Sequence, residues 1–132
     1  MNVEPLSEGE CRRLLEQATI GRLGLIVDSD PEVLPVNYAL DNGTIVFRTS
    51  RDGPLFGATR QARVAFEIDF MNPVLREGWS VLVVGPAREE QDAAEVRRLH
   101  GLQLGSWGRG DLARWVRIEL QRVTGRRVAA AP

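Results

Sequence analysis

Apolar and polar residues alternate along much of this chain, with the period of two that is typical of half-buried β-strands. Residues 63–70 are the clearest case, because Val64, Phe66, Ile68 and Phe70 are separated by charged or small residues. Similar alternation or short apolar runs mark five further segments: 20–27, 33–40, 44–49, 79–88 and 115–120, the last strand. We therefore predict about six strands.

Turn-forming residues separate these strands. Asp41-Asn42-Gly43 is a strong hairpin signal, and residues 28–31, Asp-Ser-Asp-Pro, have turn composition. Gly85-Pro86 predicts a bend within the strand at 79–88. Short connections of this kind favour strands that follow one another in meander order.

Three short helices complete the pattern. Ser7 is suited to cap a first helix that fades near residues 17–19, and Glu10 is placed to bond back to the backbone N–H of the cap. Residues 55–61 and 92–99 suit two connecting helices, and residues 101–111 a glycine-rich loop. Together, these strands, turns and helices predict a mainly β fold, a small barrel with an N-terminal capping helix, rather than a sheet of βαβ units.

The composition fits one globular domain covering residues 1–132, with loose ends at 1–5 and 128–132. The single cysteine, Cys11, excludes a disulfide framework or a cysteine-cluster metal site, and its helical position indicates packing. No apolar run approaches the roughly 20 residues of a membrane span, and Met1–Pro5 lack the features of a signal peptide. We expect a cytoplasmic protein without membrane contact.

Charge is unevenly distributed, with a net −7 over residues 1–96 and a net +6 over residues 97–132. All 17 basic residues are arginines, so a Schiff base on lysine is excluded. The basic C-terminal segment mixes arginines with apolar residues at strand spacing. This pattern favours a phosphate-binding or subunit-facing strand over nucleic-acid binding, which would use interleaved exposed aromatic residues.

Five motifs in a fixed order carry a family resemblance: residues 34–39, 45–49, 64–69, 78–83 with 85–88, and 115–118 with 123–127. Together they resemble the pyridoxamine-phosphate-oxidase-like proteins, in particular the small single-domain branch related to nitroimidazole reductases. The resemblance runs from Ser7 to Arg127. It implies a six-stranded split β-barrel that binds FMN between the two subunits of a homodimer.

The resemblance also implies which residues meet the cofactor. The strand at Pro35, Val36, Asn37 and Tyr38 would lie along the flavin ring, offering mostly backbone groups. Trp79 and Ser80 would approach the ring or the ribityl chain. Trp107 and Arg114 would reach the cofactor of the partner subunit.

The phosphate is expected at the end of the strand at 44–49 and in the loop that follows, at Arg48, Thr49, Ser50, Arg51 and Gly53. Guanidinium, hydroxyl and free N–H groups are the donors that a phosphate needs. Family members commonly carry a lysine in this loop, where this chain has Pro54, and Asp52 adds a negative charge nearby. Unless Arg51 or Arg60 replaces that lysine, FMN affinity should fall by about one to two decades.

Other interpretations of these residues stay open. Arg48 could be a solvated arginine at a strand end, and Asn37 could bond to backbone instead of flavin. Trp79 and Trp115 could be core or interface anchors, and Trp107 a lid or a dimer contact.

Two further features need an account. His100 ends a predicted helix, where it is expected to be exposed, although some split barrels bind haem and an axial ligand is the alternative. Glu67 and Asp69 share one face of a strand, and a cross-strand ion pair with Arg63 or Arg88 is the simplest account of them.

Three functions follow. The first is an FMN-dependent oxidoreductase acting on a small molecule, with no metal and no assigned catalytic side chain. The second is a reductase using a deazaflavin coenzyme, bound in a basic groove of Arg97, Arg98, Arg109 and Arg114. The third is a non-catalytic dimeric binding protein that has lost its flavin, which Pro54 supports.

Overall fold

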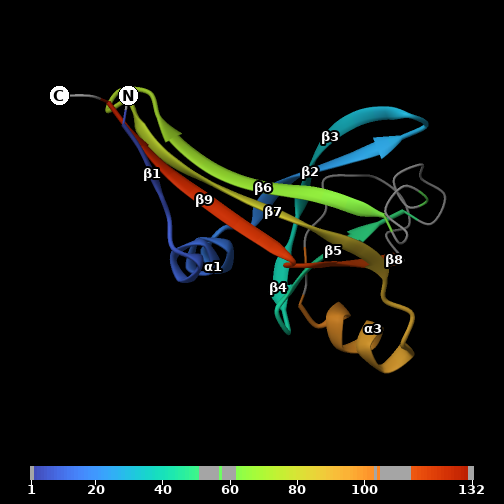
Figure 1. Ribbon diagram of the computed structural model, residues 1–132. Helices are drawn as coiled ribbons and strands as arrows, with labels where there is room; N and C mark the ends of the chain where they lie inside the picture. The colour runs from blue at the N-terminus through green and yellow to red at the C-terminus, as the bar shows by residue number, and fades with distance from the viewer. Residues whose placement is uncertain (1, 51–56, 58–61, 103, 105–113, 131–132) are drawn as a thin grey trace.

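The computed structural model describes residues 2–50, 57, 62–102, 104 and 114–130. Within these residues, two helices and nine strands form one strongly curled antiparallel sheet, a split barrel (Figure 1). The helices are α1 (Glu8–Gln17) and α3 (Ala93–His100). The strands are β1 (Asn2–Pro5), β2 (Ile20–Val27), β3 (Asp30–Asn37), β4 (Ala39–Asp41), β5 (Thr44–Thr49), β6 (Arg63–Asn72), β7 (Glu77–Glu89), β8 (Arg114–Glu119) and β9 (Arg122–Ala129).

The described residues thus contain more strands than the six that were predicted. The predicted strand at 33–40 is divided into β3 and β4 by Tyr38, whose hydroxyl is buried and donates to the Leu15 carbonyl at 2.7 Å. The predicted last strand, β8, is followed by β9. The ends that were expected to be loose are partly ordered, because Asn2–Pro5 pair with residues 126–129 of β9.

Strand β7 organises the sheet. One of its edges pairs with β6 through residues 77–86, while the other pairs with β9 through residues 78–84 and with β8 through residues 87–89. The change of partner falls at Gly85-Pro86, where a bend was predicted. A Cβ atom on Gly85 would lie 1.9 Å from the carbonyl oxygen of Glu119, so only glycine lets the strands cross so closely.

The hairpin turns are short and need positive φ. Asn42 and Gly43 have φ of 50° and 75°, which confirms the predicted hairpin between β4 and β5. The turn predicted at 28–31 consists of Asp28 and Ser29, with φ of 49° and 71°. Residues 30 and 31 already belong to β3.

The helix caps agree with those predicted from the sequence, with one difference. The Ser7 hydroxyl accepts from the N–H of Glu10 at 3.2 Å, as the capping signal predicted. The Glu10 carboxylate, however, accepts from the Ser7 hydroxyl instead of from its backbone N–H. Asp92 caps α3 by accepting from the N–H groups of Ala94 and Glu95.

The apolar core fills the inside of the curl and is closed by α1, whose Cys11 and Leu15 are buried in it. Cys11 was predicted to pack, which is confirmed, and burial raises the pKa of its thiol. A second apolar cluster, of Val46, Leu99 and Trp115, lies where α3 packs on the outside of β5 and β8. None of the described helices is both long and apolar enough to cross a bilayer.

Candidate functional site

The outward side of β3, β2, β6, β7 and β9 forms a broad surface that we call the open face. The strand register places its side chains in two adjacent rows. The first row is Pro35, Arg22, Glu67, Leu82 and Thr124, and the second is Asn37, Ile20, Asp69, Ser80 and Arg126. Three of the predicted site residues, Pro35, Asn37 and Ser80, therefore share one face.

An ion-pair cluster lies in the middle of the open face. One nitrogen of Arg22, Nη1, donates to Glu67 Oε1 at 3.1 Å and to Asp69 Oδ2 at 2.5 Å. The predicted cross-strand ion pair is confirmed, but its cation is neither Arg63, which bonds to Gln121, nor Arg88, which pairs with Glu90. Desolvation, together with the neighbouring Asp69, raises the pKa of Glu67 to about 7.

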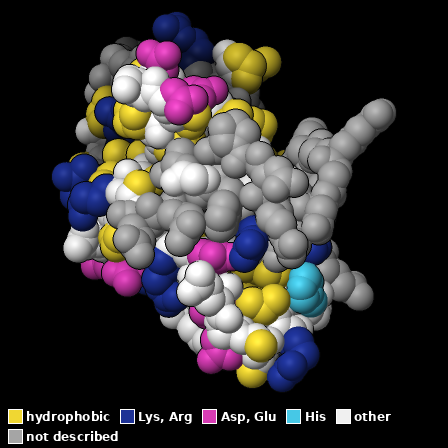
Figure 2. Space-filling view, turned by 90° about the vertical axis from the view of Figure 1, so that its right-hand side faces the viewer, with side chains coloured by type: hydrophobic (Ala, Val, Ile, Leu, Met, Phe, Trp, Pro, Cys, Tyr) yellow, Lys and Arg dark blue, Asp and Glu magenta, His cyan; other side chains and the backbone are white. Residues whose placement is uncertain are grey.

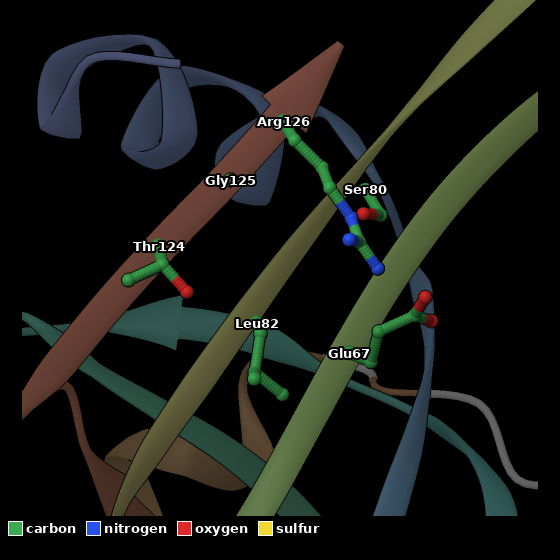
Figure 3. A pocket seen from close by; sticks show the side chains of 6 residues that line it. All are labelled: Glu67, Ser80, Leu82, Thr124, Gly125 and Arg126. Carbon is green, nitrogen blue, oxygen red and sulfur yellow. The ribbon is translucent and has the colours of Figure 1, made fainter. Parts of the chain in front are cut away.

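Beside this cluster is a pocket of about 380 Å³ lined by Glu67, Ser80, Leu82, Thr124, Gly125 and Arg126 (Figure 3). The Arg126 side chain extends from β9 across β7 toward β6, with the Ser80 hydroxyl next to it (Figure 3). A second pocket of about 260 Å³ is lined by Ile20, Gly21, Arg22, Pro35 and Asp69. The open face thus offers guanidinium, hydroxyl and carboxylate groups beside apolar side chains.

The predicted flavin strand divides between two environments. Pro35 and Asn37 lie on the open face, whereas the side chains of Val36 and Tyr38 are buried in the core. The Tyr38 ring packs edge-on against Phe66 with centroids 4.8 Å apart, and burial raises the pKa of its hydroxyl. Tyr38 can therefore offer a ligand only its backbone.

The predicted phosphate residues meet at the end of β5, but on opposite sides of it. Arg48 lies on the side of α3, with its guanidinium carbon 5.3 Å from the centroid of the Trp115 ring. Thr49 points into the barrel and is buried, Ser50 follows the strand, and Arg114 is paired across from Thr49. Arg114 also donates to Glu89 at 2.8 Å. Side chains on the two sides of β5 can therefore contact the same ligand only beyond the end of the strand.

Trp115 and His100 lie beside Arg48. Trp115 is 1% exposed, which confirms its prediction as a core residue, and its indole Nε1 has no hydrogen-bond partner within the described chain. His100 is the last residue of α3 and is exposed, as predicted, and its ring lies edge-on to Trp115 with centroids 5.7 Å apart.

Trp79 and Ser80 point to opposite faces of β7. Trp79 packs against the core and lines a pocket of about 280 Å³ with Phe70 and Arg127, among others. Ser80 lies nine residues before Glu89, near which β8 carries Arg114, and a strand rises about 3.3 Å per residue. In one chain, the Ser80 end and the Arg48 end of the predicted site are therefore on the order of 30 Å apart along β7.

Arg51, Gly53, Pro54, Arg60 and Trp107 lie outside the described residues.

Two of the four arginines of the basic groove predicted for a deazaflavin are paired with carboxylates. Arg98 donates to Asp41 at 2.7 and 2.8 Å and to Glu95, while Arg114 is bonded to Glu89. Arg97 is exposed, and Arg109 lies outside the described residues. On the side of the molecule seen in Figure 2, basic and acidic side chains lie intermixed, with hydrophobic side chains between them.

Sequence reasoning missed two residues of the open face, Arg22 and Arg126. Arg22 could have been placed on this face from the alternation along its strand, because Leu23 and Leu25 point into the core. Arg126 falls in the basic segment that was expected to form a phosphate-binding or subunit-facing strand, but the last strand was predicted to end at residue 120.

Comparisons with known proteins agree with this architecture. A family model described as pyridoxamine 5'-phosphate oxidase matches residues 7–127. The uncharacterized protein Rv0080 of Mycobacterium tuberculosis is 34% identical, over 97% of this chain and 87% of that protein. Two solved structures are similar: an FAD-binding protein from Mycobacterium smegmatis (32% identity, 96% and 99% of the chains, TM-score 0.74) and one from Mesorhizobium loti (25%, 98% and 100%, TM-score 0.82).

Proposed function

This chain belongs to the pyridoxamine 5'-phosphate oxidase family, and on that premise we propose that it is a homodimeric flavin-binding oxidoreductase acting on a small molecule. The observation that carries the proposal is the separation of the two ends of the predicted site along β7. A single flavin mononucleotide is too short to touch both ends within one chain. A second copy that brings its Ser80 end to the Arg48 end of the first would complete one site from two chains.

The residues at the end of β5 fit the phosphate of a flavin. Arg48 and Arg114 supply guanidinium groups, and Thr49 and Ser50 supply hydroxyls, all of which donate hydrogen bonds to phosphate oxygens. The buried indole N–H of Trp115 beside Arg48 is a further donor without a partner in the described chain.

A bound flavin would supply the redox chemistry, and the protein side chains would bind and orient it. Pro35 and Asn37 would present a largely apolar edge with one amide to the ring. Ser80 would offer a hydroxyl beside it. We assign no proton-transfer step to any side chain.

FAD is the second candidate cofactor beside FMN. Two similar structures are FAD-binding proteins, and FAD contains the phosphate, ribityl chain and ring of FMN. The residues named above would bind the shared part of FMN and FAD in the same way. A deazaflavin coenzyme is less well supported, because Arg98 of its predicted groove already binds the carboxylates of Asp41 and Glu95. A cytoplasmic location remains part of the proposal.

Titration of the purified chain with FMN, FAD, riboflavin and a deazaflavin coenzyme, followed by fluorescence, tests the proposal. We expect FMN or FAD to bind about one to two decades more tightly than riboflavin, which lacks the phosphate. Arg48→Gln should remove most of that difference. Arg12→Gln, on an exposed turn of α1 where Arg12 pairs with Glu8, is the matched control and should leave it unchanged.

Three outcomes would contradict the proposal. A chain that binds none of these compounds supports the non-catalytic alternative, which Pro54 favours. Tighter binding of the deazaflavin than of FMN and FAD supports the second function. Equal affinity for riboflavin and FMN would show that the residues at the end of β5 do not bind the phosphate.

A further inference from the structure

The sheet also carries side chains on the side opposite the open face, where β6, β7 and β9 reach past α1 (Figure 1). Phe70 and Trp79 are cross-strand neighbours there. Each lies two residues from a buried core residue of its own strand, so both rings point to the side of the sheet on which α1 packs. Arg127 of β9 follows Trp79 in the same row, and Glu4 of β1 follows Arg127. Two aromatic rings and a guanidinium group thus lie side by side across three strands.

These side chains line the pocket of about 280 Å³ described above, which we call the inner pocket. Its lining side chains on this face are Phe70, Glu77, Trp79, Arg127 and Ala129. Small-molecule sites in proteins usually measure roughly 300–1,000 Å³ and combine apolar walls with a few polar groups. The inner pocket therefore suits a small ligand with a single ring system.

The wall of the inner pocket is aromatic. Phe70 is 57% exposed although its side chain is large and apolar. Trp79 is partly buried and packs against the core while it lines the pocket. Offset or edge-on contacts between aromatic rings are more favourable than burial of the same area alone. The apolar part of a ligand for this pocket is therefore best matched by an aromatic ring.

The inner pocket also holds two opposite charges that do not neutralise each other. Arg127 lies opposite Trp79, and Glu77 lies two residues before Trp79 on the same face, so the two charged residues are diagonal neighbours within reach of one ligand. Within the described residues, the Glu77 carboxylate makes no ion pair or hydrogen bond. Arg127 pairs there with Glu10 at 3.8 Å, and these two side chains are 55% and 36% exposed. A ligand with both an anionic and a cationic group would satisfy both.

We propose that the inner pocket binds a free aromatic amino acid, with its ring against Phe70 and Trp79, its carboxylate on Arg127 and its ammonium group on Glu77. The two charged groups of an amino acid are attached to one carbon atom, which matches two protein groups that are diagonal neighbours. The guanidinium group donates to a carboxylate, and the Glu77 carboxylate accepts from an ammonium group. This site goes beyond the proposed function and requires neither the flavin nor a second copy, because Trp79 and Ser80 point to opposite sides of β7.

Titration of the full chain with four probes tests each part of the inferred ligand. L-phenylalanine carries the ring and both charges, phenylpropionate lacks the ammonium group, phenylethylamine lacks the carboxylate, and L-alanine lacks the ring. The indole N–H signals in nitrogen–proton NMR spectra report binding, and Trp79→Phe identifies the signal of Trp79. L-phenylalanine should shift that signal and bind at least about fivefold more tightly than each of the other three probes.

Two substitutions separate the charged contacts. Arg127→Gln should weaken the binding of phenylalanine and phenylpropionate by about fivefold and leave that of phenylethylamine unchanged. Glu77→Gln should weaken the binding of phenylalanine and phenylethylamine and leave that of phenylpropionate unchanged. Arg122→Gln is the matched control, because Arg122 lies on the same strand but points to the open face, and it should change none of these affinities. Circular dichroism establishes that each variant folds.

The inference is overturned if L-phenylalanine fails to bind at millimolar concentration, binds no more tightly than the other probes, or leaves the Trp79 signal unmoved. Equal effects of Arg127→Gln on all three aromatic probes would overturn the assigned contacts. The preference of the wild-type chain among the four probes tests the inference even if a variant does not fold. Arg127→Gln and Glu77→Gln should bind flavin as the wild type does, so the proposed function stands or fails separately.

Discussion

Arg117 donates from Nη1 to Oδ2 of Asp41 over 2.8 Å, although these side chains are only 4% and 8% exposed. Arg117 also pairs with Glu90 and Glu95, and Asp41 also accepts from Arg98. The cluster joins the β4–β5 hairpin, the end of β7, β8 and α3. It holds α3 over the outside of β5 and β8, next to Arg48 and Trp115.

Breaking this cluster should destabilise the fold. Asp41→Asn removes the carboxylate and leaves Arg117 buried with less compensation, so the free energy of unfolding should fall by about 2–4 kcal/mol. Urea unfolding followed by circular dichroism measures it. Glu8→Gln, which removes an exposed pair with Arg12, should change stability by less than about 0.5 kcal/mol. Equal effects of the two substitutions would contradict the structural role of the cluster.

The same cluster predicts a loss of stability in acid. Hydrogen bonds from Arg98 and then Arg117 lower the pKa of Asp41 to about 2, against the opposing effect of burial. A carboxylate with a lowered pKa stabilises the fold above its unfolded pKa and loses that contribution as the pH falls through the folded value. The wild type should therefore lose stability relative to Asp41→Asn between about pH 4 and pH 2. Parallel pH profiles of the two proteins would be inconsistent with the ion pairs.

Two glycines of β2 should differ sharply in their tolerance of a methyl group. A Cβ atom on Gly21 would lie 2.1 Å from the buried Phe66 ring, whereas the nearest atom to a Cβ on Gly24 is 3.6 Å away. Gly21→Ala should lower the free energy of unfolding by about 1–3 kcal/mol through overpacking, and Gly24→Ala should be neutral or slightly stabilising. Thermal unfolding of both variants decides whether the two positions differ as described.

Local signals in the sequence were sufficient for much of the fold. The alternation in β2 and β6, the Asn42-Gly43 turn and the Ser7 cap each depend on residues close together in the chain, and each was confirmed. The short β1 and the end of β9 were missed because they are stabilised by each other, more than 120 residues apart. Tyr38 divides a predicted strand because its hydroxyl finds a partner in α1, which no local pattern reveals.

The candidate site was less accessible to sequence reasoning. That Glu67 and Asp69 share a face follows from their spacing, but Arg22 becomes their partner only through the β2–β6 register. Arg48 and Thr49 are adjacent in sequence and similar in chemistry, yet strand alternation sends them to opposite sides of β5. Which side of β5 faces the interior of the barrel depends on the packing of α3 against β5 and β8. That packing joins segments that are far apart in the chain.

An absorption spectrum of the protein purified without added cofactor shows whether the chain holds a flavin. We expect flavin absorption bands, with FMN or FAD released on denaturation at about one molecule per chain. A colourless protein that also fails to take up FMN or FAD on incubation, or one that shows haem bands instead, would contradict it.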